Sequence, residues 1–334
     1  LLCRRPSWCQ FRLTNISLIF WAAISLSLLI IGHFHYNFRI KHKYLYLTRE
    51  YMQVKSFLVI VTLILVSGCS SKFAYKNLDW LAHWYIDDYI LLTEEQRVVV
   101  DQKIAIWLAW HQQEELPRYL ADLNKLTADI DDQQLSFAKL DAHQDTIKQH
   151  WARMKAKLVP DLVLMAPLLD SQQIAYLFEK LDKRNAEERK EIDETLSLSP
   201  KQQQDEVVKK YKKSITRWLG DLTPEQKTLA ANIYGELQDN DALWLDYRQR
   251  YQAELKAVFE QPDRGDSFSE RLFQLMMEPD VFRSDELNKI NAENAVNFKK
   301  MLLAINNTAT VQQREKLITE INKFARDAEA LIQD

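Results

Sequence analysis

Glycine is scarce in this sequence, with only five residues in a chain of 334. Three of them, Gly220, Gly235 and Gly265, lie after residue 69. Strand-rich folds need many tight turns with positive φ, and phosphate-binding loops need clustered glycines. The scarcity argues against both classes and leaves an all-α fold as the expectation.

Cysteine and positive charge are also in short supply. Of the three cysteines, only Cys69 lies beyond residue 9, so residues 69–334 alone can form neither an internal disulfide nor a zinc site on several thiolates. The same residues carry 36 basic and 46 acidic side chains, a formal net charge of −10. That balance argues against a nucleic-acid partner and against electrostatic binding to anionic lipid.

A short apolar run ends just before Cys69. It spans residues 57–66, follows Met52 and Lys55, and is too short to cross a bilayer as a helix. Small residues then separate it from the cysteine, as a signal peptidase requires. This pattern predicts a secretory signal over residues 52–68.

The stretch Leu65-Val-Ser-Gly-Cys69 resembles the lipobox of Gram-negative lipoproteins. The resemblance implies cleavage before Cys69 and attachment of diacylglycerol to its sulfur, with the membrane as a partner through this anchor. Ser70 follows, whereas an Asp there usually means retention in the inner membrane. We therefore expect a lipoprotein of the outer membrane that faces the periplasm.

Residues 1–51 do not fit this plan. Their apolar run at residues 16–31 is flanked by basic side chains and is marginal as a transmembrane helix. The other interpretation is an over-extended gene start, with translation beginning at Met52. We favour the second, because a complete signal peptide would have no purpose fifty residues inside a chain.

The chain after Cys69 is rich in helix-forming residues, and its apolar side chains recur at helical spacing. We expect a multi-helix bundle of about eight to ten helices. Two apolar series carry this prediction: Leu317, Ile321, Phe324, Ala328 and Leu331, and, with one gap at Asn240, Ile233, Leu237, Trp244, Tyr247, Tyr251, Leu255 and Val258. Several prolines mark helix starts, kinks and loops, including Pro117 and Pro160.

A five-residue pattern recurs at predicted helix starts. The two clean copies are Leu92-Thr-Glu-Glu-Gln96 and Leu222-Thr-Pro-Glu-Gln226. A threonine N-cap with a glutamine three residues later forms a capping box, so Thr93 with Gln96 and Thr223 with Gln226 are predicted caps. Looser copies end at Gln202, Gln173 and Gln313.

The spacing of these copies suggests two diverged halves, residues 69–215 and 216–334. The Leu-Thr-x-x-Gln pattern also resembles the repeated motif of small periplasmic helical chaperones, which hold unfolded clients on concave helical surfaces. Capping alone is the simpler explanation of the pattern.

Residues 73–90 hold six aromatic side chains. With the cap that follows, this run resembles the start of an uncharacterised family of helical Gram-negative outer-membrane lipoproteins, and the resemblance implies no known activity. Two interpretations of the run stay open. It forms a core helix, or Trp80, Trp84 and Tyr85 form an aromatic face that binds a partner or lies at the membrane interface.

Catalytic and metal motifs are weak. His83 with Asp87, and His111 with Glu114 or Glu115, have helical spacing, but we assign no catalytic residue, metal or cofactor. The favoured function is non-catalytic binding of an envelope protein partner or client. The alternatives are an envelope-modifying enzyme with an acidic cleft between helices and a structural envelope tether.

Overall fold

The computed structural model describes residues 70–334, and this part of the chain is helical without strands, which confirms the predicted all-α, multi-helix fold. The predicted extension (1–51), signal peptide (52–68) and lipid-bearing Cys69 lie outside the described residues. Contacts divide the chain into two compact units between Trp84 and Tyr85.

The first unit contributes α3 (Ser70–Lys76) and most of α4 (Leu78–Asp87) to the described residues. Asn77 separates the two helices, and its carbonyl accepts the backbone N–H of Leu81 at 3.0 Å. Ala74 and Leu81 are buried.

The second unit, Tyr85–Asp334, contains ten α-helices and three short helical turns. In chain order they are α5 (Glu94–Trp110), η1 (His111–Glu115), α6 (Leu116–Asp131), α7 (Phe137–Met165), η2 (Ala166–Leu168), α8 (Ser171–Leu196), α9 (Pro200–Leu219), α10 (Pro224–Tyr234), α11 (Asp241–Phe259), α12 (Asp266–Met277), η3 (Pro279–Phe282), α13 (Asp285–Asn307) and α14 (Val311–Gln333).

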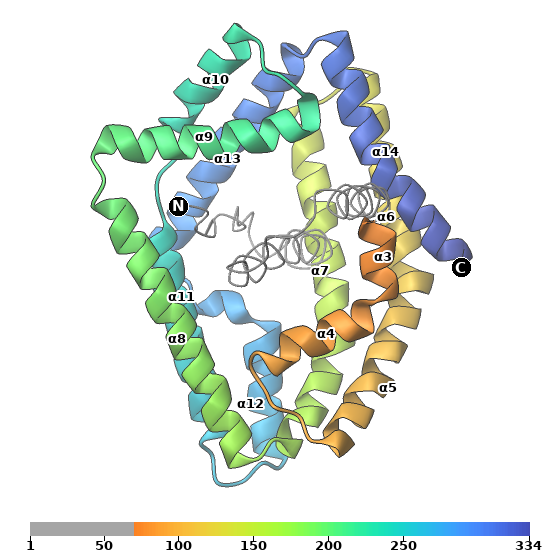
Figure 1. The fold of residues 1–334 in the computed structure, drawn as a ribbon, viewed down its shortest axis with the longest axis vertical. Helices are drawn as coiled ribbons and strands as arrows, with labels where there is room; N and C mark the ends of the chain where they lie inside the picture. Colours follow the sequence, from red (N-terminus) through yellow and green to blue (C-terminus); the bar gives the residue numbers. More distant parts are fainter. Residues whose placement is uncertain (1–69) are drawn as a thin grey trace, which may run out of the picture. The chain divides into compact units, whose positions relative to one another are not determined.

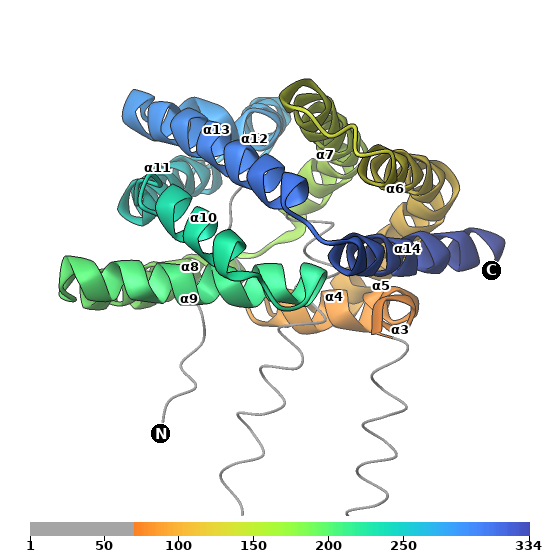
Figure 2. The ribbon, with the colours of Figure 1, turned by 90° about the horizontal axis from the view of Figure 1, so that it is seen from above.

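Helices of the second unit pack in pairs that are distant in sequence. The last helix, α14, lies along α6, and α11 lies along α8 (Figure 1). α10 lies between α9 and α13, and α13 also contacts α7 (Figure 2). Both the α6–α14 and the α8–α11 pair cross the predicted division at residues 215 and 216, so the two predicted halves interlock.

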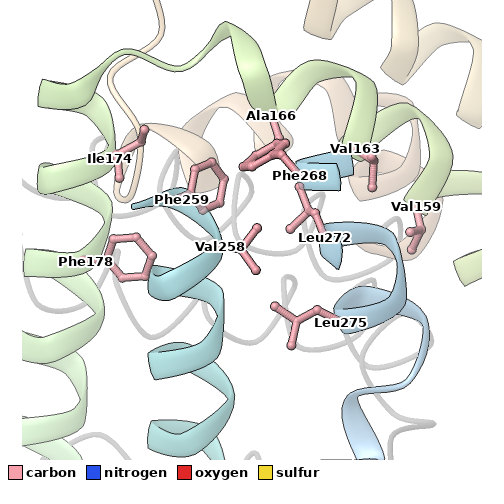
Figure 3. Packing of buried hydrophobic residues seen from close by; sticks show 10 residues of the cluster. All are labelled: Val159, Val163, Ala166, Ile174, Phe178, Val258, Phe259, Phe268, Leu272 and Leu275. Carbon is pink, nitrogen blue, oxygen red and sulfur yellow. The ribbon is translucent and has the colours of Figure 1, made fainter. Parts of the chain in front are cut away.

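The main apolar core lies where α7, α8, α11 and α12 meet (Figure 3). Phe259 contacts two other rings of this core, with its ring centroid 5.5 Å from that of Phe268 and 6.3 Å from that of Phe178. Edge-on contacts of this kind add stability beyond the area they bury. The core also contains Val159, Val163, Ala166, Ile174, Val258, Leu272 and Leu275.

The described residues form twelve α-helices, more than the eight to ten predicted. One extra boundary lies at η1, a π-helical turn that ends two residues before Pro117. A proline within a helix removes one backbone donor and crowds the carbonyl four residues earlier, and the widened turn lets the helix continue past it. Pro160, in contrast, lies inside α7 without dividing it.

Candidate functional site

The aromatic residues that the sequence assigns to partner binding lie on α4. Trp80 and Tyr85 are exposed, with 61% and 53% of their surface accessible, and Trp84 is half-buried. Tyr85 also packs beside Tyr89, with ring centroids 5.3 Å apart. Trp80 is the one exposed tryptophan among those in residues 70–334. Single exposed apolar residues are common, but exposed tryptophan and tyrosine on one short helix are the residue types that anchor protein interfaces.

The Leu-Thr-x-x-Gln pattern forms capping boxes at helix starts. At the start of α5, the Gln96 amide N–H lies 3.3 Å from Thr93 Oγ1, and the Thr93 amide donates to Gln96 Oε1 at 2.9 Å. At the start of α10, the corresponding distances between Gln226 and Thr223 are 3.2 and 3.0 Å. The three looser copies, capped by Asp170, Ser199 and Thr310, form capping boxes as well.

Four of these five glutamines bond across to a second helix. We call the first pair clamp 1, consisting of Gln96 and Gln173 with the carbonyls of Leu91 and Leu168. Gln96 Nε2 donates to the Leu168 carbonyl at 2.6 Å, and Gln173 Nε2 donates to the Leu91 carbonyl at 2.6 Å. Each Nε2 also donates to the other glutamine's Oε1, at 3.0 and 2.7 Å. Clamp 1 thereby joins the starts of α5 and α8.

The second pair, clamp 2, repeats this arrangement at the starts of α10 and α14. Gln226 Nε2 donates to the Thr308 carbonyl at 3.0 Å, and Gln313 Nε2 donates to the Asp221 carbonyl at 2.8 Å. The two glutamine amides bond to each other at 2.8 and 2.9 Å. In both clamps the accepting carbonyl lies two residues before an N-cap. Each glutamine oxygen accepts two bonds and each amide nitrogen donates two, which satisfies the whole side chain.

Gln202, in the remaining copy, behaves differently. Its described hydrogen bonds run to Ser199 within its own capping box at the start of α9. Capping alone therefore accounts for this copy. In the other four copies the same side chain both caps its own helix and joins it to another.

A buried ionic network lies next to the π-helical turn η1. Glu115 has none of its surface exposed, and its Oε1 accepts Arg153 Nε at 2.5 Å. Its Oε2 lies 2.8 Å from His150 Nδ1, while His150 Nε2 lies 2.7 Å from Asp122 Oδ2. Burial alone would raise the pKa of the Glu115 carboxyl, but the hydrogen bonds from Arg153 and His150 outweigh it and lower that pKa.

His111, which the sequence pairs with Glu114 or Glu115, begins this turn. Burial is the main cause that lowers the pKa of its imidazole to about 4, against the attraction of Glu115. The ring is therefore neutral at pH 7. Among residues 70–334, no three His, Cys, Asp or Glu side chains converge in a way that could hold a metal ion. The network ties η1 and α6 to α7.

The paired glutamines and the role of Glu115 were missed by sequence reasoning. The 77 and 87 residues that separate the members of each pair were a signal for the clamps. For Glu115, the signals were Pro117 just after it and the cation at Arg153, three residues after His150 on α7. None of the helices in residues 70–334 is both long enough and apolar enough to cross a membrane.

Residues 88–288 match the model of a family of unknown function, DUF6279. The chain belongs to the DUF6279 family. The match confirms that the chain contains an uncharacterised domain, and it includes all of clamp 1 but only the Asp221 and Gln226 side of clamp 2. Comparison with curated proteins and with solved structures found no match.

Proposed function

We propose that this protein is a lipid-anchored envelope protein whose helical body binds another protein without catalysis, through the aromatic residues of α4. The observation that carries the proposal is the exposure of Trp80 and Tyr85 on α4. The other tryptophans in the described chain are at least half-buried, so the exposure of Trp80 is not the general condition of tryptophan in this protein. When a partner covers large exposed aromatic side chains, their burial makes the free energy of binding more favourable.

The proposed anchor is diacylglycerol on Cys69, followed by delivery to the periplasmic face of the outer membrane. Its support is the lipobox sequence and the start of α3 at Ser70, directly after that cysteine. The anchor would hold α4 near a membrane surface. Cys69→Ala should abolish incorporation of radiolabelled palmitate, and a variant that still carries the label would contradict the proposed anchor.

The buried network gives no support to the enzyme alternative. Glu115 is enclosed and already paired with Arg153 and His150, so it holds helices together and offers no carboxylate to a substrate. The acidic surplus of the body also suits a partner that is not itself strongly acidic.

Site-specific photo-crosslinking in cells would test the partner-binding surface. A photoreactive amino acid at position 80 or 85 should give a discrete crosslinked protein. The same probe at Phe273, an exposed aromatic on α12 with 39% of its surface accessible, is the matched control and should give none. Equal crosslinking at all three positions, or none at position 80 or 85, would contradict the proposal.

A purified assay would separate client binding from binding of one dedicated partner. The protein should delay aggregation of reduced, unfolded α-lactalbumin at near-equal concentrations if it binds unfolded clients. Trp80→Ala should weaken that delay several-fold, while Phe273→Ala and the helical circular dichroism stay unchanged. Crosslinking at position 80 with no such delay would assign a dedicated partner in place of unfolded clients.

A further inference from the structure

The two glutamine clamps have the same hydrogen bonds but different access to water. In clamp 2, Gln226 has none of its surface exposed and Gln313 has 6%. In clamp 1, Gln173 is equally buried at 6%, but Gln96 is only half-buried. One side of clamp 1 is therefore open to solvent, whereas both sides of clamp 2 are closed.

The residues around the clamps repeat this difference. Leu92, just before the N-cap of α5, is half-buried, and its counterpart Leu222 before α10 is buried at 5% exposed. Leu91 and Leu168, whose carbonyls accept the clamp 1 amides, have 57% and 51% of their surface exposed. The side chains of Leu91 and Leu168 themselves therefore lose little packing when the two segments separate.

The chain leading into each clamp differs as well. The four residues before the first helix of each clamp form no helix, 90–93 before α5 and 220–223 before α10. Before clamp 1, Asp87 at the end of α4 pairs with Arg97 in the first turn of α5 at 2.7 Å, and both side chains are partly exposed. Clamp 2 follows α9, which packs on α14 and so holds the preceding segment against one of the two helices that the clamp joins. Clamp 2 is thus reinforced by the packing of two helices, whereas clamp 1 is reinforced by an ion pair that water reaches.

We infer that clamp 1 is a latch that opens separately from the rest of the body, while clamp 2 stays closed until the whole body unfolds. Water can replace the hydrogen bonds of Gln96 as they break, because this side chain already meets solvent. Gln226 has no such access, so opening clamp 2 leaves buried polar groups unpaired or requires the surrounding helices to separate.

The structure also limits how far the latch opens. Farther along α5, Lys103 Nζ donates to Asp161 Oδ1 at 2.6 Å and Trp107 Nε1 donates to Asp161 Oδ2 at 2.9 Å. These bonds hold the middle of α5 to α7. Opening of clamp 1 therefore detaches only the first turns of α5 from the start of α8.

Hydrogen exchange of the intact protein, followed by mass spectrometry, tests this inference without any substitution. The probes are the backbone amides bonded within the capping boxes. Amides of Thr93, Gln96, Asp170 and Gln173 should exchange at least about tenfold faster than those of Thr223, Gln226, Thr310 and Gln313. Low urea should leave the first group unchanged and accelerate the second. Equal rates with equal urea dependence in both groups would overturn the inference.

A pair of substitutions separates a latch from simple helix capping. Gln96→Ala should accelerate exchange of the Asp170 and Gln173 amides on the opposite helix several-fold, because the Gln173 side chain, which completes their capping box, loses its bonds to Gln96. Gln202→Ala removes an equivalent capping-box side chain that makes no described bond to another helix, and it should leave both clamps unchanged. Acceleration confined to residues 93–97 in the Gln96 variant would assign Gln96 to capping alone and overturn the latch.

Discussion

Clamp 1 and clamp 2 are built from the same side chains at the same positions relative to their helix starts, yet they differ in how far water reaches them. Gln96 and Gln226 each satisfy a capping box and then donate to a carbonyl two residues before the other N-cap. Only Gln226 does so with no exposed surface. The comparison separates the geometry of a hydrogen bond from its contribution to stability. The sequence motif sets the geometry, and the surroundings set how much each bond contributes to stability.

The same comparison bears on the proposed halves of the chain. Clamp 1 lies within residues 69–215 and clamp 2 lies within residues 216–334, while α6 packs on α14 and α8 packs on α11 in a reciprocal manner. Such reciprocity is what two copies of one unit would produce around an approximate two-fold axis. That the halves are diverged copies stays a prediction, which the paired clamps support.

The largest expected effect comes from outside the clamps. Glu115→Gln removes the carboxylate that pairs with Arg153 and His150. It should destabilise the body by about 3 kcal/mol, because both side chains lose a buried, charged partner. If clamp 2 opens only on global unfolding, its amides should then exchange faster. The exchange rates of the clamp 1 amides should change little. The difference in exchange rate between the two clamps should therefore become smaller, through the change at clamp 2 alone. Equal acceleration at both clamps would show that clamp 1 opens with the whole body.

Acid sensitivity provides a second readout of the same variant. The pKa of Glu115 is lowered in the folded state, so the stability that it contributes is present above the ordinary pKa of glutamate. It is lost as the pH falls through the lowered pKa. Urea denaturation between neutral and acidic pH should therefore show a shallower loss of stability in Glu115→Gln than in the unaltered protein. Identical slopes would contradict a contribution from this carboxylate.

A smaller difference is expected between the clamps themselves. Gln226→Ala leaves Gln313 and the Thr308 carbonyl short of buried partners and should cost about 2–3 kcal/mol. Gln96→Ala should cost about 1–1.5 kcal/mol, since water reaches the groups it leaves behind. Urea unfolding followed by circular dichroism measures both. Equal losses of stability in the two variants would mean that solvent exposure does not change how much these hydrogen bonds contribute to the free energy of unfolding.

The sequence predicted the all-α fold because composition and apolar spacing report on helices directly. It did not predict that Gln96 meets Gln173, since a capping box is local and the second helix start lies 77 residues away. Apolar spacing continues from Ile233 to Trp244 with a gap only at Asn240, yet α10 already ends at Tyr234 and α11 begins at Asp241. There, the Asn294 side chain on α13 bonds both the amide and the carbonyl of Gln238, which holds the loop between the helices.

The surface on α4 shows another limit of sequence reasoning. The aromatic run fits either a core helix or a binding surface, because burial is decided by what packs against it. Leu81 and Trp80 are neighbours in sequence, yet the first is 2% exposed and the second 61%. Similarly, Pro117 signalled a break in a helix, but not that a π-helical turn would enclose Glu115.

The smallest expected effect concerns the one N-cap that differs in kind between the clamps. Clamp 1 has Asp170 where clamp 2 has Thr310, and the aspartate accepts the amides of Gln172 and Gln173, each at 2.8 Å. Asp170→Thr gives clamp 1 a threonine at both N-caps, as in clamp 2, and threonine is still a favourable N-cap residue. It should cost only about 0.5 kcal/mol, because one of two bonds and a favourable charge at the helix start are lost. If solvent access sets the behaviour of clamp 1, its amides should still exchange well ahead of those of clamp 2 in this variant. Exchange at clamp 1 that slows to the clamp 2 rate would instead show that the aspartate, and not the exposure of Gln96, makes clamp 1 the one that opens.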